Sequence, residues 1–175
     1  VEGAEGYYYD ESGEECNAHI SEFSILKVKD YVNSDNFYCT YGDGIANVDI
    51  DALTKFHFQN QSIATLTAVR PTTRFGVVDL DDSDQVIGFR EKPKTDSWVN
   101  GGYFVFNNRI FDYLSETVAL ETEPLQNLAA QKNLAAFKHE DFWQPVDTIR
   151  EAQMLSELWN SGGANWDRWT SRKSR

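Results

Sequence analysis

A carboxylate between two glycines is the first feature of this sequence that could do chemistry. Asp43 stands in Gly42-Asp43-Gly44, directly after the apolar and aromatic run Asn36 to Tyr41. Such a run predicts a buried strand that the glycines end. Ligands collect at the carboxyl ends of strands in a sheet covered on both faces, so an acid there can meet a metal or a phosphate. Taken alone, the tripeptide is more typical of an ordinary turn.

Three other segments carry candidate groups beside predicted elements. Asp147 precedes a helical pattern, where an acid alone is most typical of a helix cap. Lys92 stands in an EKP tripeptide, and most lysines are simply exposed to solvent. Gly101-Gly102 interrupts the start of an apolar run, so that a ligand or another backbone can come close. Each segment has an ordinary structural explanation, so only their combination can indicate chemistry.

Helical and extended patterns alternate along the chain and must position these residues. Alternating β-branched residues predict a strand at Ile63 to Val69, and the turn formers of Asp81 to Asp84 predict a hairpin of Phe75 to Leu80 with Gln85 to Glu91. The remaining expected elements are a helix from about Asp51 capped by Asp49 or Asp51, a strand at Trp98 to Asn107, helices starting at Arg109 and Pro124, a strand at Leu134 to His139, and a helix capped by Thr148. This alternation predicts an α/β fold, with a mostly parallel sheet and a β-hairpin insertion in one domain.

The first 24 residues differ in composition from the rest. Acids alternate there with glycines and with a run of three tyrosines, without a clear period. This pattern is typical of a mobile or poorly packed acidic leader. We therefore expect a leader over residues 1–24 and the fold proper over residues 25–175, which ends in an aromatic tail.

Composition excludes several classes of function. The 28 acidic and 16 basic residues of the 175 give a net charge of -12, which disfavours a nucleic-acid partner held through its phosphates. No apolar run approaches a membrane span, and the N-terminus lacks the pattern of a signal peptide, so we expect a soluble cytoplasmic protein without a membrane partner. Two cysteines exclude a disulfide framework and a four-cysteine zinc site. The three histidines form no cluster with metal-ligand spacing.

Six strings together resemble one family. In chain order they read TYGDGIANVDI, ATLTAVRPTTRFGVVDL, FREKPK, VNGGYFVFN, EPLQNLA and FWQPVDTIR. From about Ile25 to Trp169 the chain resembles the sugar-1-phosphate nucleotidyltransferases, and among them the glucose-1-phosphate cytidylyltransferases. The resemblance implies a Rossmann-like sheet and transfer of a cytidylyl group from CTP to α-D-glucose 1-phosphate, with Mg2+ as cofactor. It also implies a homo-oligomer acting in nucleotide-sugar biosynthesis for lipopolysaccharide O-antigen.

The resemblance also implies roles for the charged candidates. Asp43 and Asp147 match the family's magnesium-binding pair, and two carboxylates suit a cation that aligns crowded phosphate oxygens. Both are expected at strand-to-loop exits, where they can converge. Lys92 matches the lysine that contacts the sugar phosphate, and an ammonium on a flexible stem can follow that phosphate as it is attacked. These three are the catalytic candidates.

Three neighbouring residues match the sugar-binding part of the family. Glu91 matches a residue that accepts hydrogen bonds from sugar hydroxyls. Asn100 and Gly101 match the sugar pocket, where an amide both donates and accepts while glycine clears space. A simple turn is the alternative for Asn100 and Gly101.

The chain departs from the family at its front. Such enzymes begin with a strand and a glycine-rich loop whose amides cradle the nucleotide phosphates, and nothing here matches that loop. Either the first part is absent or it has been replaced. Three interpretations follow: a cytidylyltransferase seen through an incomplete chain, an inactive sugar-phosphate-binding or assembly module, or a transferase for another nucleotide or sugar. The first agrees best with the six strings.

Three tryptophans lie near the C-terminus. Trp159, Trp166 and Trp169 would bury much apolar surface, and aromatic residues are enriched where subunits meet. We therefore expect the tail to take part in oligomer contacts. Packing of the tail back onto its own domain is the alternative.

Overall fold

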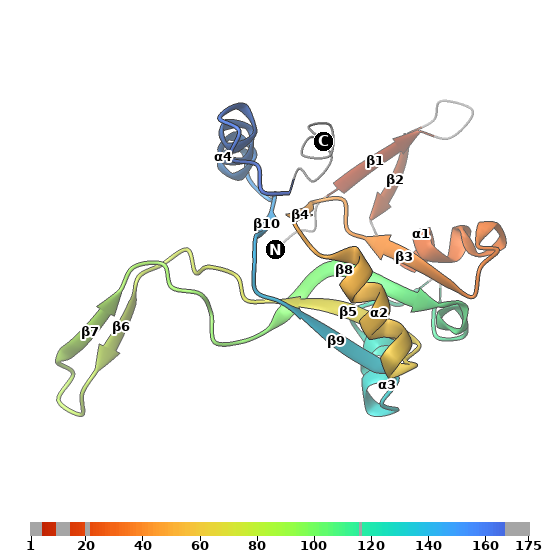
Figure 1. The fold of residues 1–175 in the computed structure, drawn as a ribbon, viewed down its shortest axis with the longest axis horizontal. Helices are drawn as coiled ribbons and strands as arrows, with labels where there is room; N and C mark the ends of the chain where they lie inside the picture. Colours follow the sequence, from red (N-terminus) through yellow and green to blue (C-terminus); the bar gives the residue numbers. More distant parts are fainter. Residues whose placement is uncertain (1–4, 10–14, 20–21, 116, 167–175) are drawn as a thin grey trace. The chain divides into compact units, whose positions relative to one another are not determined.

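The main sheet has four strands in the order β3-β8-β5-β9. The computed structural model describes residues 5–9, 15–19, 22–115 and 117–166 (Figure 1). Strand β3 (Asn36–Thr40) lies at one edge and pairs antiparallel with β8 (Val99–Asn107). Strand β5 (Ala64–Val69) is buried at five of its six residues, two of which are threonines, and β9 (Leu134–His139) forms the other edge. The expected strands of this sheet are confirmed.

The described chain forms two compact units, each drawn from three separate segments. The first comprises Val1–Tyr41, Asp49–Leu66 and Tyr103–Phe137, and the second comprises Gly42–Val48, Thr67–Gly102 and Lys138–Arg175. The main apolar core belongs to the first unit; its buried members are Ile63, Ala64, Phe104, Phe106, Ile110, Phe111, Leu120, Leu125 and Leu128. All the candidate site residues fall within the second unit.

Helix α2 (Ile50–Asn60) begins one residue before Asp51, the expected first residue. Asp49 is its N-cap, because its side chain accepts the hydrogen bond of the Ala52 amide at 3.0 Å. Gln61 ends the helix in the left-handed region, with φ of 52°. Of the two capping acids that the sequence offers, the first is therefore the cap.

The single buried histidine of α2 ties three elements of the first unit together. His57 Nδ1 lies 2.8 Å from Thr65 Oγ1 and His57 Nε2 lies 3.1 Å from Asn36 Oδ1. Asn107 Nδ2 donates to the same Asn36 oxygen. An amide oxygen only accepts, so His57 Nε2 carries the proton and donates to it. His57 Nδ1 is then unprotonated and accepts from the Thr65 hydroxyl. Burial lowers the pKa of His57. Its two ring nitrogens are both used within the fold.

The predicted hairpin is present as β6 (Val77–Leu80) and β7 (Val86–Arg90). A second strand pair, β4 (Gly44–Ala46) with β10 (Trp143–Pro145), was not predicted from the sequence. Each of its strands has only three residues, too few to show a period. This pair belongs to the second unit and positions Asp43 and Asp147.

Three helical segments complete the described chain after β8. The segment at Arg109 forms the 3-10 helix η2 (Asn108–Asp112) and not the expected α-helix; its buried Ile110 and Phe111 are adjacent rather than spaced along a stripe. Helix α3 (Glu123–Ala130) has Pro124 in its first turn, and α4 (Ile149–Asn160) follows the N-cap Thr148, both as expected. No helix among the described residues is long and apolar enough to span a membrane.

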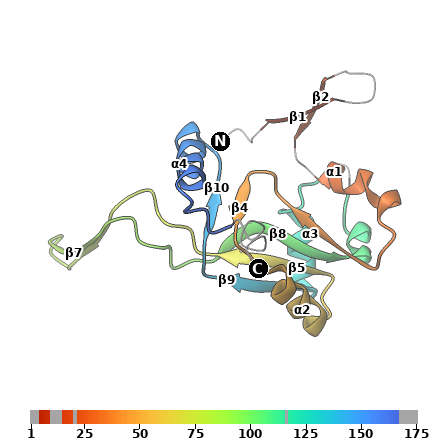
Figure 2. The ribbon, with the colours of Figure 1, turned by 45° about the horizontal axis from the view of Figure 1, so that its top comes forward.

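The leader contains regular structure that its composition did not predict. Strands β1 (Glu5–Tyr9) and β2 (Glu15–His19) pair antiparallel, and α1 (Glu22–Lys27) and η1 (Lys29–Tyr31) follow (Figure 2). Tyrosine has a high strand propensity, which accounts for the first strand despite the acids around it.

Candidate active site

Asp43 and Asp147 lie at adjoining ends of one strand pair. In the antiparallel register of β4 and β10, Pro145 is opposite Gly44. One residue further along, the Val146 amide donates to the Asp43 carbonyl oxygen at 2.7 Å. The two carboxylate-bearing residues, which are 104 positions apart in the sequence, are therefore held in neighbouring backbone segments. The structure brings this predicted pair together.

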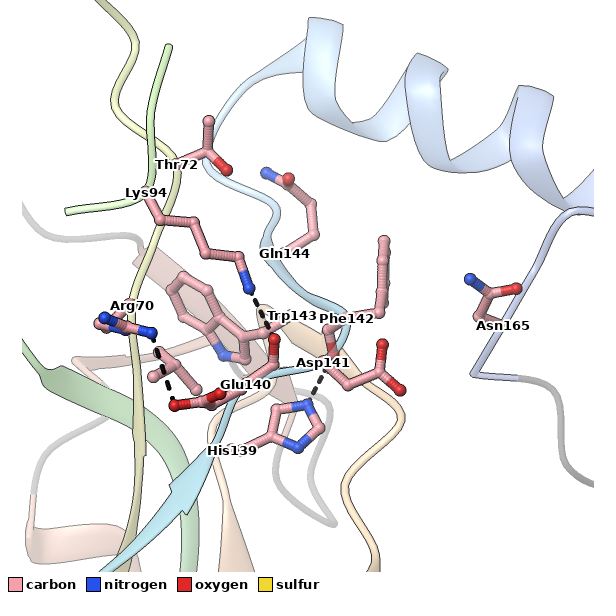
Figure 3. Close-up of a pocket in the computed structure, with 11 residues that line it drawn as sticks. Arg70, Thr72, Lys94, His139, Glu140, Asp141, Phe142, Trp143, Gln144 and Asn165 are labelled. Atoms are coloured by element: carbon pink, nitrogen blue, oxygen red, sulfur yellow. Dashed lines mark hydrogen bonds and ion pairs between the residues drawn. The ribbon is translucent and has the colours of Figure 1, made fainter. Parts of the chain in front are cut away.

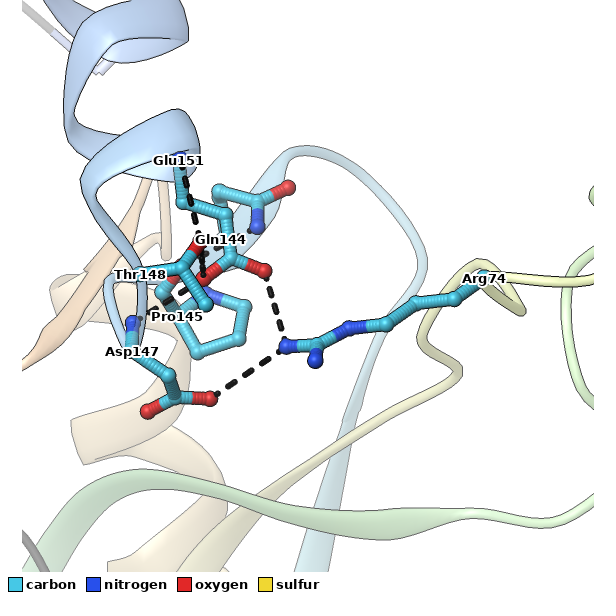
Figure 4. A network of polar contacts seen from close by, with 6 residues as sticks. All are labelled: Arg74, Gln144, Pro145, Asp147, Thr148 and Glu151. Carbon is cyan, nitrogen blue, oxygen red and sulfur yellow. Dashed lines mark hydrogen bonds and ion pairs between the residues drawn. The ribbon is translucent and has the colours of Figure 1, made fainter.

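The carboxylate of Asp147 faces an arginine, Arg74, that no sequence motif indicated. Arg74 Nη2 lies 3.7 Å from Asp147 Oδ2 and 2.9 Å from Glu151 Oε1 (Figure 4). The Asp147 side chain is about half exposed, whereas that of Glu151 is mostly buried. Arg74 is therefore anchored on Glu151 and makes the longer, looser contact with Asp147.

Glu151 is fixed by a capping box at the start of α4. The Thr148 hydroxyl accepts the Glu151 amide at 3.3 Å and donates to Glu151 Oε2 at 3.0 Å, while the Asp147 amide donates to the same oxygen at 3.0 Å. Burial alone would raise the pKa of Glu151, but these hydrogen bonds and the charge of Arg74 outweigh it and lower that pKa. Thr148 is the N-cap, so Asp147 is not the helix cap and its carboxylate is directed elsewhere.

Lys92 lines a cavity of about 750 Å³ with two arginines. The lining includes Arg74, Lys92 and Arg150 but a single carboxylate, that of Glu151, although acids outnumber bases in the whole sequence. Such a concentration of cations in an acidic protein attracts anions locally. Lys92 has φ of 45° and its ammonium lies 3.4 Å from Glu91 Oε1, an exposed ion pair that a substrate can replace at little cost. The structure thus places the predicted lysine where a phosphate would be attracted.

Asn100 and Gly101 are positioned differently from a ligand-facing pair. Asn100 Oδ1 accepts the Gly102 amide at 3.0 Å, and the Gly101 carbonyl accepts Trp143 Nε1–H at 2.8 Å. A Cβ at Gly101 would lie 2.9 Å from a Val69 methyl and 3.0 Å from the Thr67 carbonyl oxygen. Of the two reasons for a glycine here, the close approach of another backbone is the one that the structure provides. Neither residue is among those that line the 750 Å³ cavity.

A second cavity, of about 350 Å³, has cations that already bind protein groups (Figure 3). Lys94 Nζ donates to the Glu140 carbonyl oxygen at 2.6 Å, and Arg70 Nη2 lies 3.4 Å from Glu140 Oε1. The Arg70 guanidinium also stacks on Trp98, 5.0 Å from the ring centroid. Asp141 accepts from Asn47 Nδ2 at 2.7 Å, and this hydrogen bond lowers its pKa. Both cations of this cavity thus already contact protein oxygens, although Arg70 Nε is buried without a hydrogen-bond partner, so this cavity is less suited to an anion.

One tryptophan of the tail packs within its own chain. Trp166 stacks on Phe142 with ring centroids 4.9 Å apart. Trp159 remains about half exposed, and Trp169 lies outside the described residues. The alternative of a tail that folds back therefore describes Trp166, whereas the expected oligomer contact of the tail stays a prediction.

The residues present fit a divalent cation only together with a substrate. No group of three or more His, Cys, Asp or Glu side chains in the described part of the chain could hold a metal ion by itself. Magnesium commonly uses one or two carboxylates and takes its other ligands from phosphates and water. Asp43 and Asp147, on adjoining segments, supply a donor set of that kind. Neither is among the residues that line the 750 Å³ cavity, but Asp147 contacts Arg74, which does line it.

Comparisons with known proteins identify the family to which the chain belongs. The family model described as nucleotidyl transferase matches residues 21–155. The chain is 45% identical over 148 residues to a glucose-1-phosphate cytidylyltransferase of Salmonella typhi, which covers 83% of this chain and 57% of that protein. It is 36% identical over 147 residues to a probable glucose-1-phosphate cytidylyltransferase of Bacillus subtilis, and this match covers 83% of this chain and 58% of that protein. The chain thus spans somewhat over half the length of these relatives.

Solved structures share the fold at low sequence identity. A putative glucose-1-phosphate thymidylyltransferase from Bacillus anthracis superposes with a TM-score of 0.59 and 18% identity, over 81% of this chain and 62% of that one. HddC from Yersinia pseudotuberculosis superposes with a TM-score of 0.59 and 18% identity, over 82% of this chain and 64% of that one. The predicted α/β, Rossmann-like class is confirmed at the level of fold, and the sheet is mixed, with mostly parallel and some antiparallel strands.

Proposed function

Because the chain belongs to the nucleotidyl transferase family, we propose that this protein transfers a cytidylyl group from CTP to α-D-glucose 1-phosphate, giving CDP-glucose and pyrophosphate. The observation that carries the proposal is the meeting of Asp43 and Asp147 at one strand pair beside a cavity lined by three cations. Its nucleotide and sugar are taken from the printed names of the relatives at 45% and 36% identity.

The chemistry requires binding and charge neutralisation more than proton transfer. A phosphate oxygen of glucose 1-phosphate attacks the α-phosphorus of CTP, one O–P bond forms, and the bond from the α-phosphorus to the oxygen bridging it to the β-phosphorus breaks. The attacking oxygen is already anionic near neutral pH, so no general base is needed. Positive groups are needed to let two polyanions meet. Lys92, Arg74 and Arg150 supply them around one cavity.

Asp43 and Asp147 would hold Mg2+ with the nucleotide phosphates. When bound, this ion neutralises and aligns phosphate oxygens. Asp147 must first give up Arg74, and the 3.7 Å contact is the weaker of the two that Arg74 makes. Arg74 stays tied to Glu151 and thus remains beside the phosphates with its charge available.

Sugar recognition is assigned to the segment that precedes Lys92 and to the turn at Asn100. Glu91 pairs with Lys92 and is exposed, so its carboxylate is accessible to a sugar hydroxyl. Asn100 and Gly101 would act through the backbone turn that they shape rather than by lining the cavity. The proposal also includes a cytoplasmic location, a homo-oligomeric assembly and a role in nucleotide-sugar biosynthesis for lipopolysaccharide O-antigen.

Two assays test the function. The chain alone should form no CDP-glucose from CTP, glucose 1-phosphate and Mg2+, because nothing in it matches the phosphate-cradling loop. A chimera that carries the N-terminal part of the Salmonella typhi relative before Ile25 should form CDP-glucose, detected by anion-exchange chromatography and by pyrophosphate release. UTP and dTTP, and mannose 1-phosphate, serve as competing substrates. A chimera that prefers any of these over CTP or glucose 1-phosphate contradicts the specificity, and an inactive but folded chimera supports the binding-module alternative.

A further inference from the structure

Trp143 connects two parts of the proposed site that lie far apart in the sequence. It is the first residue of β10, the strand whose pairing with β4 brings Asp147 beside Asp43. Its indole Nε1–H donates to the Gly101 carbonyl oxygen at 2.8 Å, and Gly101 follows Asn100 in β8. One side chain thus joins the strands of the proposed metal pair to the turn to which sugar recognition is assigned.

The acceptor of this hydrogen bond is fixed by the main sheet. Gly101 is buried, and a Cβ in its place would lie 2.9 Å from a Val69 methyl and 3.0 Å from the Thr67 carbonyl oxygen. Both of these neighbours are themselves buried in β5, the strand next to β8. Close-packed interiors leave little room for movement, so a group that binds the Gly101 carbonyl takes its position from the sheet.

The strand pair that carries the aspartates is short and needs such an anchor. Strands β4 and β10 have three residues each, and a two-stranded ladder alone is marginally stable. The Gln144 side chain donates to the adjacent Pro145 carbonyl, and proline has no backbone donor. In β10, which the structure describes completely, Trp143 is therefore the residue whose side chain hydrogen-bonds to a strand of the main sheet.

The other polar link between these segments is more exposed. Arg74 reaches Asp147 over 3.7 Å, and both side chains of this ion pair are more than half exposed, whereas the hydrogen bond of Trp143 is partly buried. An indole N–H can only donate, and leaving it buried without an acceptor costs free energy. The Trp143 bond is thus suited to fix a position, and the Arg74 contact is suited to be exchanged.

The indole ring also lines both cavities. Trp143 is among the residues around the 750 Å³ cavity and among those around the 350 Å³ cavity (Figure 3). A small side chain at this position would therefore change the shape of both cavities as well as remove the hydrogen bond. Phenylalanine keeps an aromatic wall and removes the donor, so Trp143→Phe is the informative substitution.

We propose that Trp143 is a positioning residue for the transfer reaction. Its N–H fixes β10 on Gly101 and, through the β4–β10 pair, fixes the backbone of Asp43 and Asp147. The proposal rests on the proposed function, in which these aspartates hold the metal ion. Small misplacements of groups around a reacting centre lower the rate strongly. Loss of the hydrogen bond should therefore lower turnover while glucose 1-phosphate still binds.

Amide hydrogen exchange on the chain itself, followed by NMR, tests the anchoring without an activity assay. The Val146 amide, which donates to the Asp43 carbonyl, should exchange about fivefold to tenfold faster in Trp143→Phe, the factor that one net hydrogen bond supplies. The Asn107 amide, which donates to the Ile63 carbonyl in the first unit, is the internal reference and should not change. Unchanged exchange at Val146 overturns the proposal.

Trp98→Phe is the matched control. The Trp98 ring packs against Arg70 and Lys138, with their charged groups 5.0 Å and 5.2 Å from its centroid. This substitution removes an indole from the same unit without removing the bond to Gly101, so exchange at Val146 should keep its wild-type rate. Equal acceleration in both variants contradicts a specific role of Trp143.

Steady-state kinetics of the chimera test the consequence for the reaction. Trp143→Phe should lower kcat about tenfold and leave the KM for glucose 1-phosphate within about twofold, whereas Trp98→Phe should match the wild type. A higher KM without loss of kcat, or faster exchange with unchanged kcat, overturns the positioning role. An inactive wild-type chimera would instead refute the proposed function, and exchange at Val146 would still decide whether Trp143 anchors the strand pair.

A second variant applies if Trp143→Phe does not fold. Benzothienylalanine, introduced at position 143 by amber suppression, has sulfur in place of the indole N–H and keeps the shape of the ring. It should give the same faster exchange at Val146 and the same lower kcat. Wild-type values of both would show that the N–H of Trp143 positions nothing.

Discussion

The two compact units of this chain use their polar groups differently. In the first unit His57 binds Thr65 and Asn36 through its two ring nitrogens, and nine buried residues form an apolar core. In the second unit charged side chains line cavities, and several ion pairs are exposed. Groups that stabilise the fold have fixed partners, whereas groups available for substrate have loose ones. We therefore expect stability and chemistry to be separable by mutation.

The separation can first be tested in the core. Phe106 is fully buried and stacks on Phe104 with centroids 5.0 Å apart, so Phe106→Ala should lower the free energy of unfolding by about 3–5 kcal/mol. Urea denaturation measures this. Arg150→Gln, at the cation-lined cavity of the second unit, is the matched control and should change stability by about 0.5 kcal/mol or less. Equal losses from both would contradict the comparison.

The proposed metal pair should show the largest effect on chemistry. In the active chimera, Asp43→Asn or Asp147→Asn should reduce turnover by about a hundredfold or more, since loss of one carboxylate weakens the hold on a cation at the transferring phosphate. Steady-state assays at saturating Mg2+ measure it. The control is Asp141→Asn, because the Asp141 carboxylate accepts a hydrogen bond from Asn47 at the second cavity. Its turnover should stay within about twofold of wild type. Near-normal turnover of either proposed ligand variant removes that residue from the site.

Each of the two cavities is lined by one lysine, Lys92 in the 750 Å³ cavity and Lys94 in the 350 Å³ cavity, so substituting each in turn tests which cavity binds the sugar phosphate. Lys92→Ala should lower kcat/KM for glucose 1-phosphate by about tenfold to a hundredfold, with little change in the KM for CTP. Lys94→Ala is the control, because Lys94 donates to the Glu140 carbonyl of the second cavity and should affect the sugar phosphate little. An effect of Lys92→Ala that is confined to CTP contradicts the assignment.

Arg74 should show a smaller effect, on metal affinity. Its guanidinium competes with a cation for Asp147, so Arg74→Ala should tighten Mn2+ binding about threefold to tenfold, as measured by electron paramagnetic resonance in the presence of CTP. Arg70→Ala, whose guanidinium contacts Glu140 and Trp98, should leave Mn2+ affinity unchanged. Weaker metal binding in Arg74→Ala would show that the arginine supports the site rather than competing with the ion.

Local signals in the sequence were sufficient for most elements. The strands with clear patterns and the Thr148 cap were predicted, and the cap of α2 was narrowed to Asp49 or Asp51, because each depends on a few neighbouring residues. The pairing of β4 with β10 was not, since three-residue strands show no period and their partner lies about a hundred positions away. The 3-10 geometry of η2 was not predicted, because a helix of five residues is also too short to show a period.

The candidate site was predictable only in part. Asp43, Asp147 and Lys92 were proposed from their strings; the structure adds the strand pair that holds the two aspartates on neighbouring segments and the cavity that Lys92 lines. Glu151 could have been found, because Thr148 and Glu151 have the spacing of a capping box. Arg74 could not, because its acidic partners lie more than 70 residues later in the sequence.

The smallest expected effect is a pH dependence of stability that belongs to the first unit. Burial lowers the pKa of His57 below its ordinary value of 6.5. As the pH falls through about 6.5, the unfolded chain takes up a proton at this residue while the folded chain does not, so the free energy of unfolding must decrease. The decrease continues until the lowered pKa of the folded state is reached.

Urea denaturation at half-unit steps from pH 7.5 to 5 measures this slope. His57→Gln should be less stable at every pH but should lose the slope in this window, whereas His139→Gln should keep it. Asp141 and Glu151 have lowered pKa values, so their stabilising contribution is present above their ordinary values of 3.8 and 4.5 and is lost only as the pH falls further. A slope near pH 6 that survives in His57→Gln would show that the titrating group lies elsewhere.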